Sequence, residues 1–158
     1  MISYNEDTIA AISTPPGEGG IAVVRISGKS SKSIADRIFH GKIKPSKAQS
    51  HTVHFGKIID PDNSEFVDEV LLTVMSGPNS YTAEDVIEIS SHGGQLVAKK
   101  ILDLCLKSGA RNALPGEFTQ RADHPRFDNS QLPVKIIETG DDLFRKRVAV
   151  PRWAAFYD

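Results

Sequence analysis

Cysteine is nearly absent from this sequence, since Cys105 is the only one among 158 residues. A single cysteine excludes an internal disulfide framework and a cysteine-rich zinc site. The sequence also lacks an apolar run of the roughly 20 residues that cross a membrane, and residues 1–7 do not form a signal peptide. We therefore expect a cytoplasmic protein that is not held at a membrane.

A surplus of positive charge is absent too. The chain has 19 lysine and arginine residues against 20 aspartate and glutamate residues, for a formal net charge of -1. Binding of DNA or RNA through bulk electrostatics needs a basic surplus or stripe, so this balance argues against that class. The hydrophobic share of 39% is ordinary for a globular chain, and the length suits one domain or one domain with a tail.

Short β-branched runs alternate with two amphipathic stretches, which predicts strands interleaved with helices. The turn at residues 60–64 separates two of the strands, so these two are expected to form an antiparallel hairpin. The pattern favours an α+β fold with a mixed or antiparallel sheet and flanking helices. The expected strands are residues 21–26, 51–59, 67–75 and 85–90, the expected helices are residues 31–39 and 95–107, and residues 113–121 lead into a further helical segment.

Gly28-Lys29-Ser30 follows a predicted strand and precedes a predicted helix, as the end of a phosphate-binding P-loop does. A P-loop also needs a glycine five residues before its Gly-Lys pair, and here that position is Val23, inside the strand. The loop at residues 15–20 is rich in glycine, but such loops are common in plain turns. We therefore reject nucleotide binding at residues 28–30.

Two charged residues stand out because they interrupt apolar strands. Arg25 shares a strand face with Ile21 and Val23, and Glu88 shares one with Val86. A charge among β-branched residues is costly to bury unless it is paired or bound. The commoner outcome is a structural ion pair, or two charges that face water at an edge. The functional alternative is a partly buried ligand site, in which Glu88 accepts two hydrogen bonds from an amino-pyrimidinone edge and Arg25 donates to a carbonyl or carboxylate.

The remaining candidates are weaker. His51 and His54 are three apart in a predicted strand, which places them on opposite faces, so a metal site is not expected there. His92 lies in a Ser-His-Gly-Gly turn and could bind a ligand, although fixing the turn is its simpler role. Cys105 lies on the apolar side of a predicted helix and is interpreted as inert core. We assign no catalytic residue.

Three stretches of the sequence form long motifs in a fixed order. They are DTI at residues 7–9, continued by TPPGEGGI and RISG up to residue 28; GPNSYTAEDVIEI at residues 77–89, followed by HGG; and PGEFTQRA at residues 115–122. In this order and spacing, residues 6–122 resemble the amino-terminal domain of the MnmE (TrmE) family of tRNA modification GTPases. The resemblance is highly specific, because each motif is long and all three are collinear.

The resemblance implies a fold similar to the folate-binding domain of the glycine-cleavage aminomethyltransferase. It also implies a domain that forms a homodimer and binds 5-formyl-tetrahydrofolate or a related one-carbon tetrahydrofolate. In the family, an arginine of the second strand and the second glutamate of a GEDVxE-like motif contact the folate. These positions match Arg25 and Glu88, the two charges that the strand pattern had already singled out. The loop at residues 15–20 and the His92–Gly94 turn are expected to form walls near this pair.

Full-length members of the family continue into a helical domain with an inserted GTPase domain, which uses GTP, magnesium and potassium. With a MnmG-type flavoprotein they modify the wobble uridine of certain tRNAs at C5, in a carboxymethylaminomethyl-type modification. The present sequence has no P-loop, no Asn-Lys-x-Asp guanine motif and no reactive carboxy-terminal cysteine motif. We therefore expect the chain alone to hydrolyse no GTP, and we do not expect this domain itself to contact tRNA.

Residues 1–122 are expected to form the folate-binding and dimerisation domain, and residues 123–158 to be a tail that does not match the family and is poorly ordered or foreign. Phe127 stands where the family has a folate-contacting lysine, and Ala83 where it has the glycine before Glu84. The tail suggests a truncated or frameshifted product. Two alternatives stay open: a non-catalytic self-association or partner-docking module without ligand binding, and an unrelated nucleic-acid binder with the basic triplet at residues 145–147.

Overall fold

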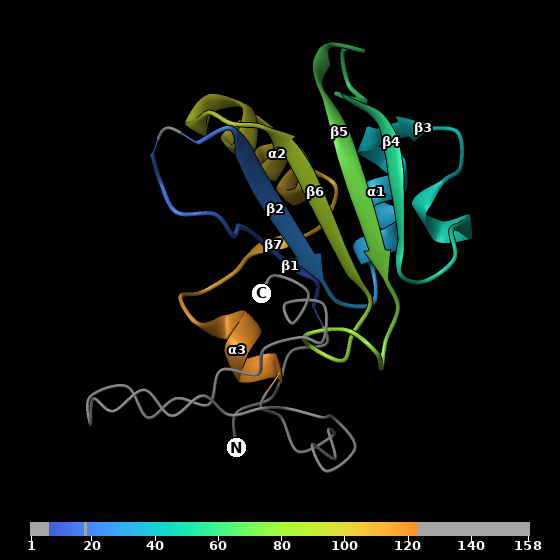
Figure 1. The fold of residues 1–158 in the computed structure, drawn as a ribbon, viewed down its shortest axis with the longest axis vertical. Helices are drawn as coiled ribbons and strands as arrows, with labels where there is room; N and C mark the ends of the chain where they lie inside the picture. Colours follow the sequence, from blue (N-terminus) through green and yellow to red (C-terminus); the bar gives the residue numbers. More distant parts are fainter. Residues whose placement is uncertain (1–6, 18, 123–158) are drawn as a thin grey trace, which may run out of the picture. The chain divides into compact units, whose positions relative to one another are not determined.

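The computed structural model describes residues 7–17 and 19–122, which form a curved sheet with two helices packed on one face (Figure 1). The described sheet has seven strands in the order β3-β4-β5-β6-β2-β1-β7. The elements are, in chain order, β1 (Ile9–Ile12), β2 (Ile21–Ser27), α1 (Ser31–Ile38), β3 (Phe39–Gly41), the 3-10 helix η1 (Pro45–Lys47), β4 (Thr52–Ile59), β5 (Phe66–Met75), β6 (Val86–His92), α2 (Gln95–Lys107), β7 (Arg111–Asn112) and α3 (Glu117–Ala122). The α+β class with a mixed sheet is confirmed.

Antiparallel pairing joins every neighbouring pair of described strands except β1 and β7, which run parallel. The predicted β4–β5 hairpin forms around the turn at residues 60–64. The Asp60 N–H donates to the Glu65 carbonyl at 2.9 Å, and the Asp60 carboxylate accepts the N–H of Asp62 at 2.9 Å. The turn residues thus satisfy one another's polar groups, which is why they end one strand and begin the next.

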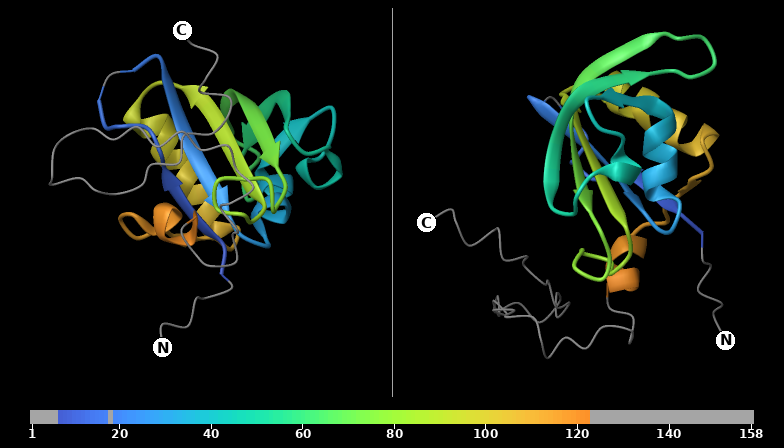
Figure 2. Two further views of the ribbon diagram at one scale, coloured as in Figure 1. Left: turned by 60° about the horizontal axis from the view of Figure 1, so that its bottom comes forward. Right: turned by 90° about the vertical axis from the view of Figure 1, so that its right-hand side faces the viewer.

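Successive side chains of a strand point to opposite faces of the sheet, and those on one face form a core with α1 and α2. Figure 2 shows both helices on the same side of the sheet. Val24 and Ile26 of β2 and Ile87 and Ile89 of β6 are fully buried there. The helices contribute apolar residues three or four apart, as amphipathic helices do, namely Ile34, Ala35 and Ile38 of α1 and Ile101, Leu104 and Cys105 of α2. Each buried isoleucine or leucine stabilises the fold by about 1.5–3 kcal/mol, so this layer is the main source of stability.

The opposite face of the sheet, called the open face below, is not covered by α1 or α2. Ile21, Val53, Phe55 and Leu71 are exposed apolar residues of strands β2, β4 and β5, and they are 65, 59, 63 and 49% exposed. Phe55 lies directly opposite Leu71 in the β4–β5 register. Odd-numbered residues of β2 and even-numbered residues of β6 also belong to this face. Arg25 and Glu88 therefore lie on the open face.

The sequence pattern missed four short elements, β1, β3, η1 and β7. The helix expected over residues 31–39 ends at Ile38, because Phe39 has an extended backbone and begins β3. β7 consists of two residues, too few to show an alternating pattern. In the part of the chain that the structure describes, no helix is both long and apolar enough to traverse a bilayer. The predictions for residues 123–158, Phe127 and the basic triplet included, fall outside the described residues.

Candidate functional site

Arg25 and Glu88 lie side by side on the open face. β2 and β6 pair in a register that sets the two residues directly opposite each other. Arg25 Nε donates to Glu88 Oε1 at 2.8 Å, and Arg25 Nη2 lies 2.7 Å from the same oxygen. The two side chains are 26 and 25% exposed. The ion pair that was one interpretation of the sequence therefore forms, and solvent reaches it.

Two aromatic rings flank the Arg25 guanidinium. Its central carbon lies 5.4 Å from the centre of the Tyr81 ring and 5.5 Å from the centre of the Phe118 ring. Both distances are within the range of cation–π attraction. Tyr81 comes from the loop between β5 and β6, and Phe118 comes from α3. The strand pattern could not find these rings, although both lie in the motifs at residues 77–89 and 115–122.

The geometry of the ion pair determines what it can bind. Both contacts from Arg25 end on Oε1 of Glu88, which leaves Oε2 of Glu88 outside the pair. A carboxylate accepts donors at both oxygens, so Glu88 can take a further donor without losing Arg25. The two rings add flat apolar surface beside the charges. A flat heterocycle with adjacent hydrogen-bond donors suits these groups.

The glycine-rich loop at residues 15–20 and the His92–Gly94 turn were expected to form walls near the Arg25–Glu88 pair. They do contact each other, because the Gly93 N–H donates to the Gly20 carbonyl at 2.9 Å. However, the residue opposite His92 is Ile21, four residues before Arg25. Four residues along a strand correspond to about 13 Å, so the loop and the turn lie at the far end of β2 and β6. The side chains that flank the pair belong to Tyr81 and Phe118.

The weaker candidates have structural roles. His92 Nδ1 lies 2.8 Å from Asp68 Oδ1, and the His92 backbone N–H donates to Asp68 Oδ2 at 2.8 Å, so His92 fixes its turn. Burial raises the pKa of the Cys105 thiol to about 12, which fits an inert core residue. Within residues 28–30, the Ser30 N–H donates to Thr8 Oγ1 at 2.9 Å. That amide is therefore engaged by the chain's own side chain.

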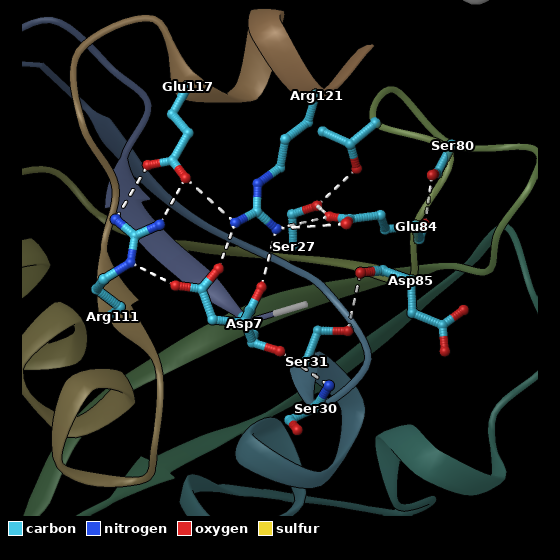
Figure 3. A network of polar contacts seen from close by, with 12 residues as sticks. Asp7, Ser27, Ser30, Ser31, Ser80, Glu84, Asp85, Arg111, Glu117 and Arg121 are labelled. Atoms are coloured by element: carbon cyan, nitrogen blue, oxygen red, sulfur yellow. Dashed lines mark hydrogen bonds and ion pairs between the residues drawn. The ribbon is translucent and has the colours of Figure 1, made fainter. Parts of the chain in front are cut away.

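A network of charged side chains joins α3 to the segment before β1 and to the loop between β5 and β6 (Figure 3). Arg121 of α3 is at its centre and is only 8% exposed. Arg121 Nη2 donates to Asp7 Oδ1 at 2.7 Å and to Glu117 Oε1 at 3.2 Å, and Nη1 donates to Glu84 Oε2 at 3.1 Å. Arg111 Nη2 donates to Glu117 Oε1 at 2.6 Å, and its Nε donates to Asp7. Three carboxylates and two guanidinium groups thus pair with one another, which offsets the free-energy cost of burying their charges.

These contacts shift the acidities of the members. The hydrogen bond from Arg111 is the main cause that holds the pKa of Asp7 below its ordinary value. Burial by itself would raise the pKa of Glu117, but hydrogen bonds from Arg111, the Leu114 N–H and Arg121 outweigh it and the pKa is lowered. Burial also acts to lower the pKa of Arg121, and the surrounding carboxylates, Glu84 first, raise it instead. Asp7, Glu117 and Arg121 are therefore charged at neutral pH.

The three motifs meet in this structure. Arg121 of the third motif contacts Asp7 of the first and Glu84 of the second. Arg25 of the first motif contacts Tyr81 and Glu88 of the second and Phe118 of the third. The family model described as "GTP-binding protein TrmE N-terminus" matches residues 8–125.

Curated relatives called "tRNA modification GTPase MnmE" match most of the chain. That of Acetivibrio thermocellus is 50% identical over 144 residues, which are 91% of this chain and 30% of the relative. That of Lactiplantibacillus plantarum is 52% identical over 141 residues, 89% of this chain and 29% of the relative. That of Streptococcus sanguinis is 48% identical over 147 residues, 93% of this chain and 31% of the relative.

An alignment of 144 residues is longer than residues 1–122, so it extends into the tail that was expected not to match the family. The chain spans about 30% of the length of these relatives. The chain therefore belongs to the MnmE (TrmE) family of tRNA modification GTPases and corresponds to the amino-terminal domain of its members.

Proposed function

We propose that this domain binds a tetrahydrofolate that carries a one-carbon unit, 5-formyl-tetrahydrofolate or a close relative, and that it forms a homodimer. The observation that supports this most is the Arg25–Glu88 pair between the Tyr81 and Phe118 rings, on a face of the sheet that solvent reaches. The proposal includes a likeness of this domain to the folate-binding domain of the glycine-cleavage aminomethyltransferase.

The proposed binding mode assigns a role to each group. The amino-pyrimidinone edge of a pterin offers adjacent N–H donors, which a carboxylate such as Glu88 accepts in parallel. Because Arg25 contacts only Oε1, such a ligand takes Oε2 directly and shares or replaces the Arg25 contact at Oε1. Arg25, once partly released, donates to a carbonyl or carboxylate of the ligand. The rings of Tyr81 and Phe118 cover the flat faces.

The open face also supports the proposed self-association. Its exposed apolar residues on β2, β4 and β5 include Phe55 and Leu71, which lie opposite each other. Adjoining exposed apolar side chains of this kind are typical of protein interaction surfaces. A second copy of the domain would cover them.

In the whole enzyme, the domain would hold the one-carbon donor for C5 modification of the wobble uridine in tRNA. GTP hydrolysis, with its magnesium and potassium, and the MnmG-type flavoprotein partner would belong to the longer chain. We propose a cytoplasmic location and no GTP hydrolysis by residues 1–158 alone.

A second candidate is a docking module without ligand binding. Arg25 and Glu88 already neutralise each other, which is what a purely structural ion pair would do. In that case the open face would bind a second copy or another protein, and the ion pair would only stabilise the sheet.

Calorimetric titration of the chain with 5-formyl-tetrahydrofolate separates the two candidates. We expect saturable binding that weakens roughly 100-fold in Glu88→Ala and Arg25→Ala, because each loses charge-assisted hydrogen bonds to the ligand. Glu69→Ala is the matched control, since Glu69 is a carboxylate in the same sheet that pairs with Lys57 at 3.9 Å. A wild-type chain that is folded by circular dichroism but binds no folate would support the docking module.

A further inference from the structure

We propose that Arg121 is a positioning residue that holds the Tyr81 and Phe118 rings against Arg25, an inference that rests on the proposed function of the Arg25–Glu88 pair. Arg121 itself is nearly buried, and it bonds to carboxylates from three separate segments of the chain. Its role would be to fix the walls of the ligand site without touching the ligand.

The three carboxylates tie together the segments that form the site. Asp7 precedes β1, Glu84 lies in the loop between β5 and β6, and Glu117 begins α3 (Figure 3). Arg121 also donates from Nη1 to the main-chain carbonyl of Asp7 at 2.9 Å. Only a planar guanidinium offers enough donors in fixed directions to join these acceptors at once, and a lysine ammonium at this position could not reach all of them.

The rings that flank Arg25 lie on two of the joined segments. Tyr81 is three residues before Glu84, and Phe118 follows Glu117 directly. Because Arg121 is itself a residue of α3, its contact with Glu84 fixes the distance between the loop and α3. The Tyr81 hydroxyl lies 3.2 Å from Thr119 Oγ1, which is a further contact across the same junction.

The network also reaches the strand that carries Arg25. Ser27 of β2 is two residues after Arg25, on the same face of the strand. Its hydroxyl donates to Glu84 Oε2 at 2.7 Å and lies 2.6 Å from Thr82 Oγ1. The Glu84 carboxylate is thus bound both by Arg121 of α3 and by Ser27 of β2. These two contacts hold the loop that carries Tyr81 in a fixed position relative to Arg25.

Comparison with Arg111 separates two roles of an arginine in this network, namely holding the rings in place and neutralising the carboxylates. Arg111 contacts Asp7 and Glu117, as Arg121 does, but no contact with Glu84 is found among the described residues. It is also more exposed, at 39% against 8% for Arg121. Of the two arginines, only Arg121 joins α3 to the loop that carries Tyr81.

The test compares Arg121→Lys with Arg111→Lys in the full chain. The first readout needs no ligand. Aromatic rings that stack on the Arg25 guanidinium shift the resonances of the adjacent Arg25 Hδ protons upfield in the proton NMR spectrum. We expect Arg121→Lys to move these resonances toward their unfolded-chain positions and Arg111→Lys to move them less. The second readout is calorimetric affinity for 5-formyl-tetrahydrofolate, which should fall by about tenfold in Arg121→Lys.

A double-mutant cycle with Phe118→Leu excludes a purely structural role. If Arg121 acts through the ring, Phe118→Leu should reduce affinity less in the Arg121→Lys background than in the wild type. Full additivity, or Arg25 resonances that stay in place, would overturn the proposal. Should Arg121→Lys fail to fold, Glu84→Gln takes its place, because it removes the charge but keeps an oxygen for Ser27. If the wild type binds no folate, the proposed function fails while the NMR comparison still decides whether Arg121 holds the rings.

Discussion

Alanine at position 93 should destabilise the domain strongly, because two pieces of backbone meet there without room for a side chain. A Cβ built on Gly93 would lie 1.4 Å from the Gly19 carbonyl oxygen and 2.5 Å from the Gly19 carbonyl carbon. Both neighbours are backbone atoms, so no side chain can rotate away to relieve the clash. The loop at residues 15–20 or the end of β6 has to move.

The structure sets the size of the effect. The Cβ and the Gly19 oxygen must separate from 1.4 Å to at least 3.0 Å. That shift pulls apart the hydrogen bond from the Gly93 N–H to the Gly20 carbonyl, which is 2.9 Å long. Overpacking typically costs about 1–3 kcal/mol and a lost hydrogen bond about 1 kcal/mol, so we expect unfolding to become easier by about 2–4 kcal/mol.

Urea unfolding followed by circular dichroism measures this change. Gly20→Ala is the matched control, because a Cβ there has no atom within 4 Å although Gly20 is in the same contact. We expect Gly20→Ala to stay within about 0.5 kcal/mol of the wild type. Equal stabilities of Gly93→Ala and Gly20→Ala would refute the reasoning, since they would mean that the loop yields without cost.

Two further predictions concern acid stability and self-association. The folded pKa of Asp7 is lowered, mainly by its hydrogen bond from Arg111, so its stabilisation is complete above the unfolded pKa near pH 4 and is lost as pH falls through the folded value. Urea midpoints should therefore fall more steeply below about pH 4 in the wild type than in Asp7→Asn, and equal slopes would contradict this assignment. Phe55→Ser should weaken the proposed homodimer by about tenfold or more in sedimentation equilibrium, because it removes a large apolar side chain from the open face. The control Leu96→Ser changes a residue of α2 that is even more exposed than Phe55, at 84% against 63%, and should leave association as it is.

Signals between near neighbours in the sequence were enough for most of the secondary structure. Residues 21–26 are mostly β-branched and bounded by glycines, and the structure has β2 there. The turn residues at 60–64 were enough to predict the β4–β5 hairpin. The period of two along a strand also placed Arg25 on a face with Ile21 and Val23, opposite the buried Val24. Such signals are readable because they depend on a few adjacent residues.

Tertiary structure alone decided what surrounds Arg25. The period of a strand does not say which strand lies beside it or in which register, so only the β2–β6 pairing sets Glu88 opposite Arg25. The rings of Tyr81 and Phe118 belong to a loop and a short helix, so the alternating pattern of a strand cannot predict that they lie beside Arg25. The sequence by itself thus determined the class of fold and singled out two charges, whereas the folded chain decided that these charges meet each other between two aromatic rings.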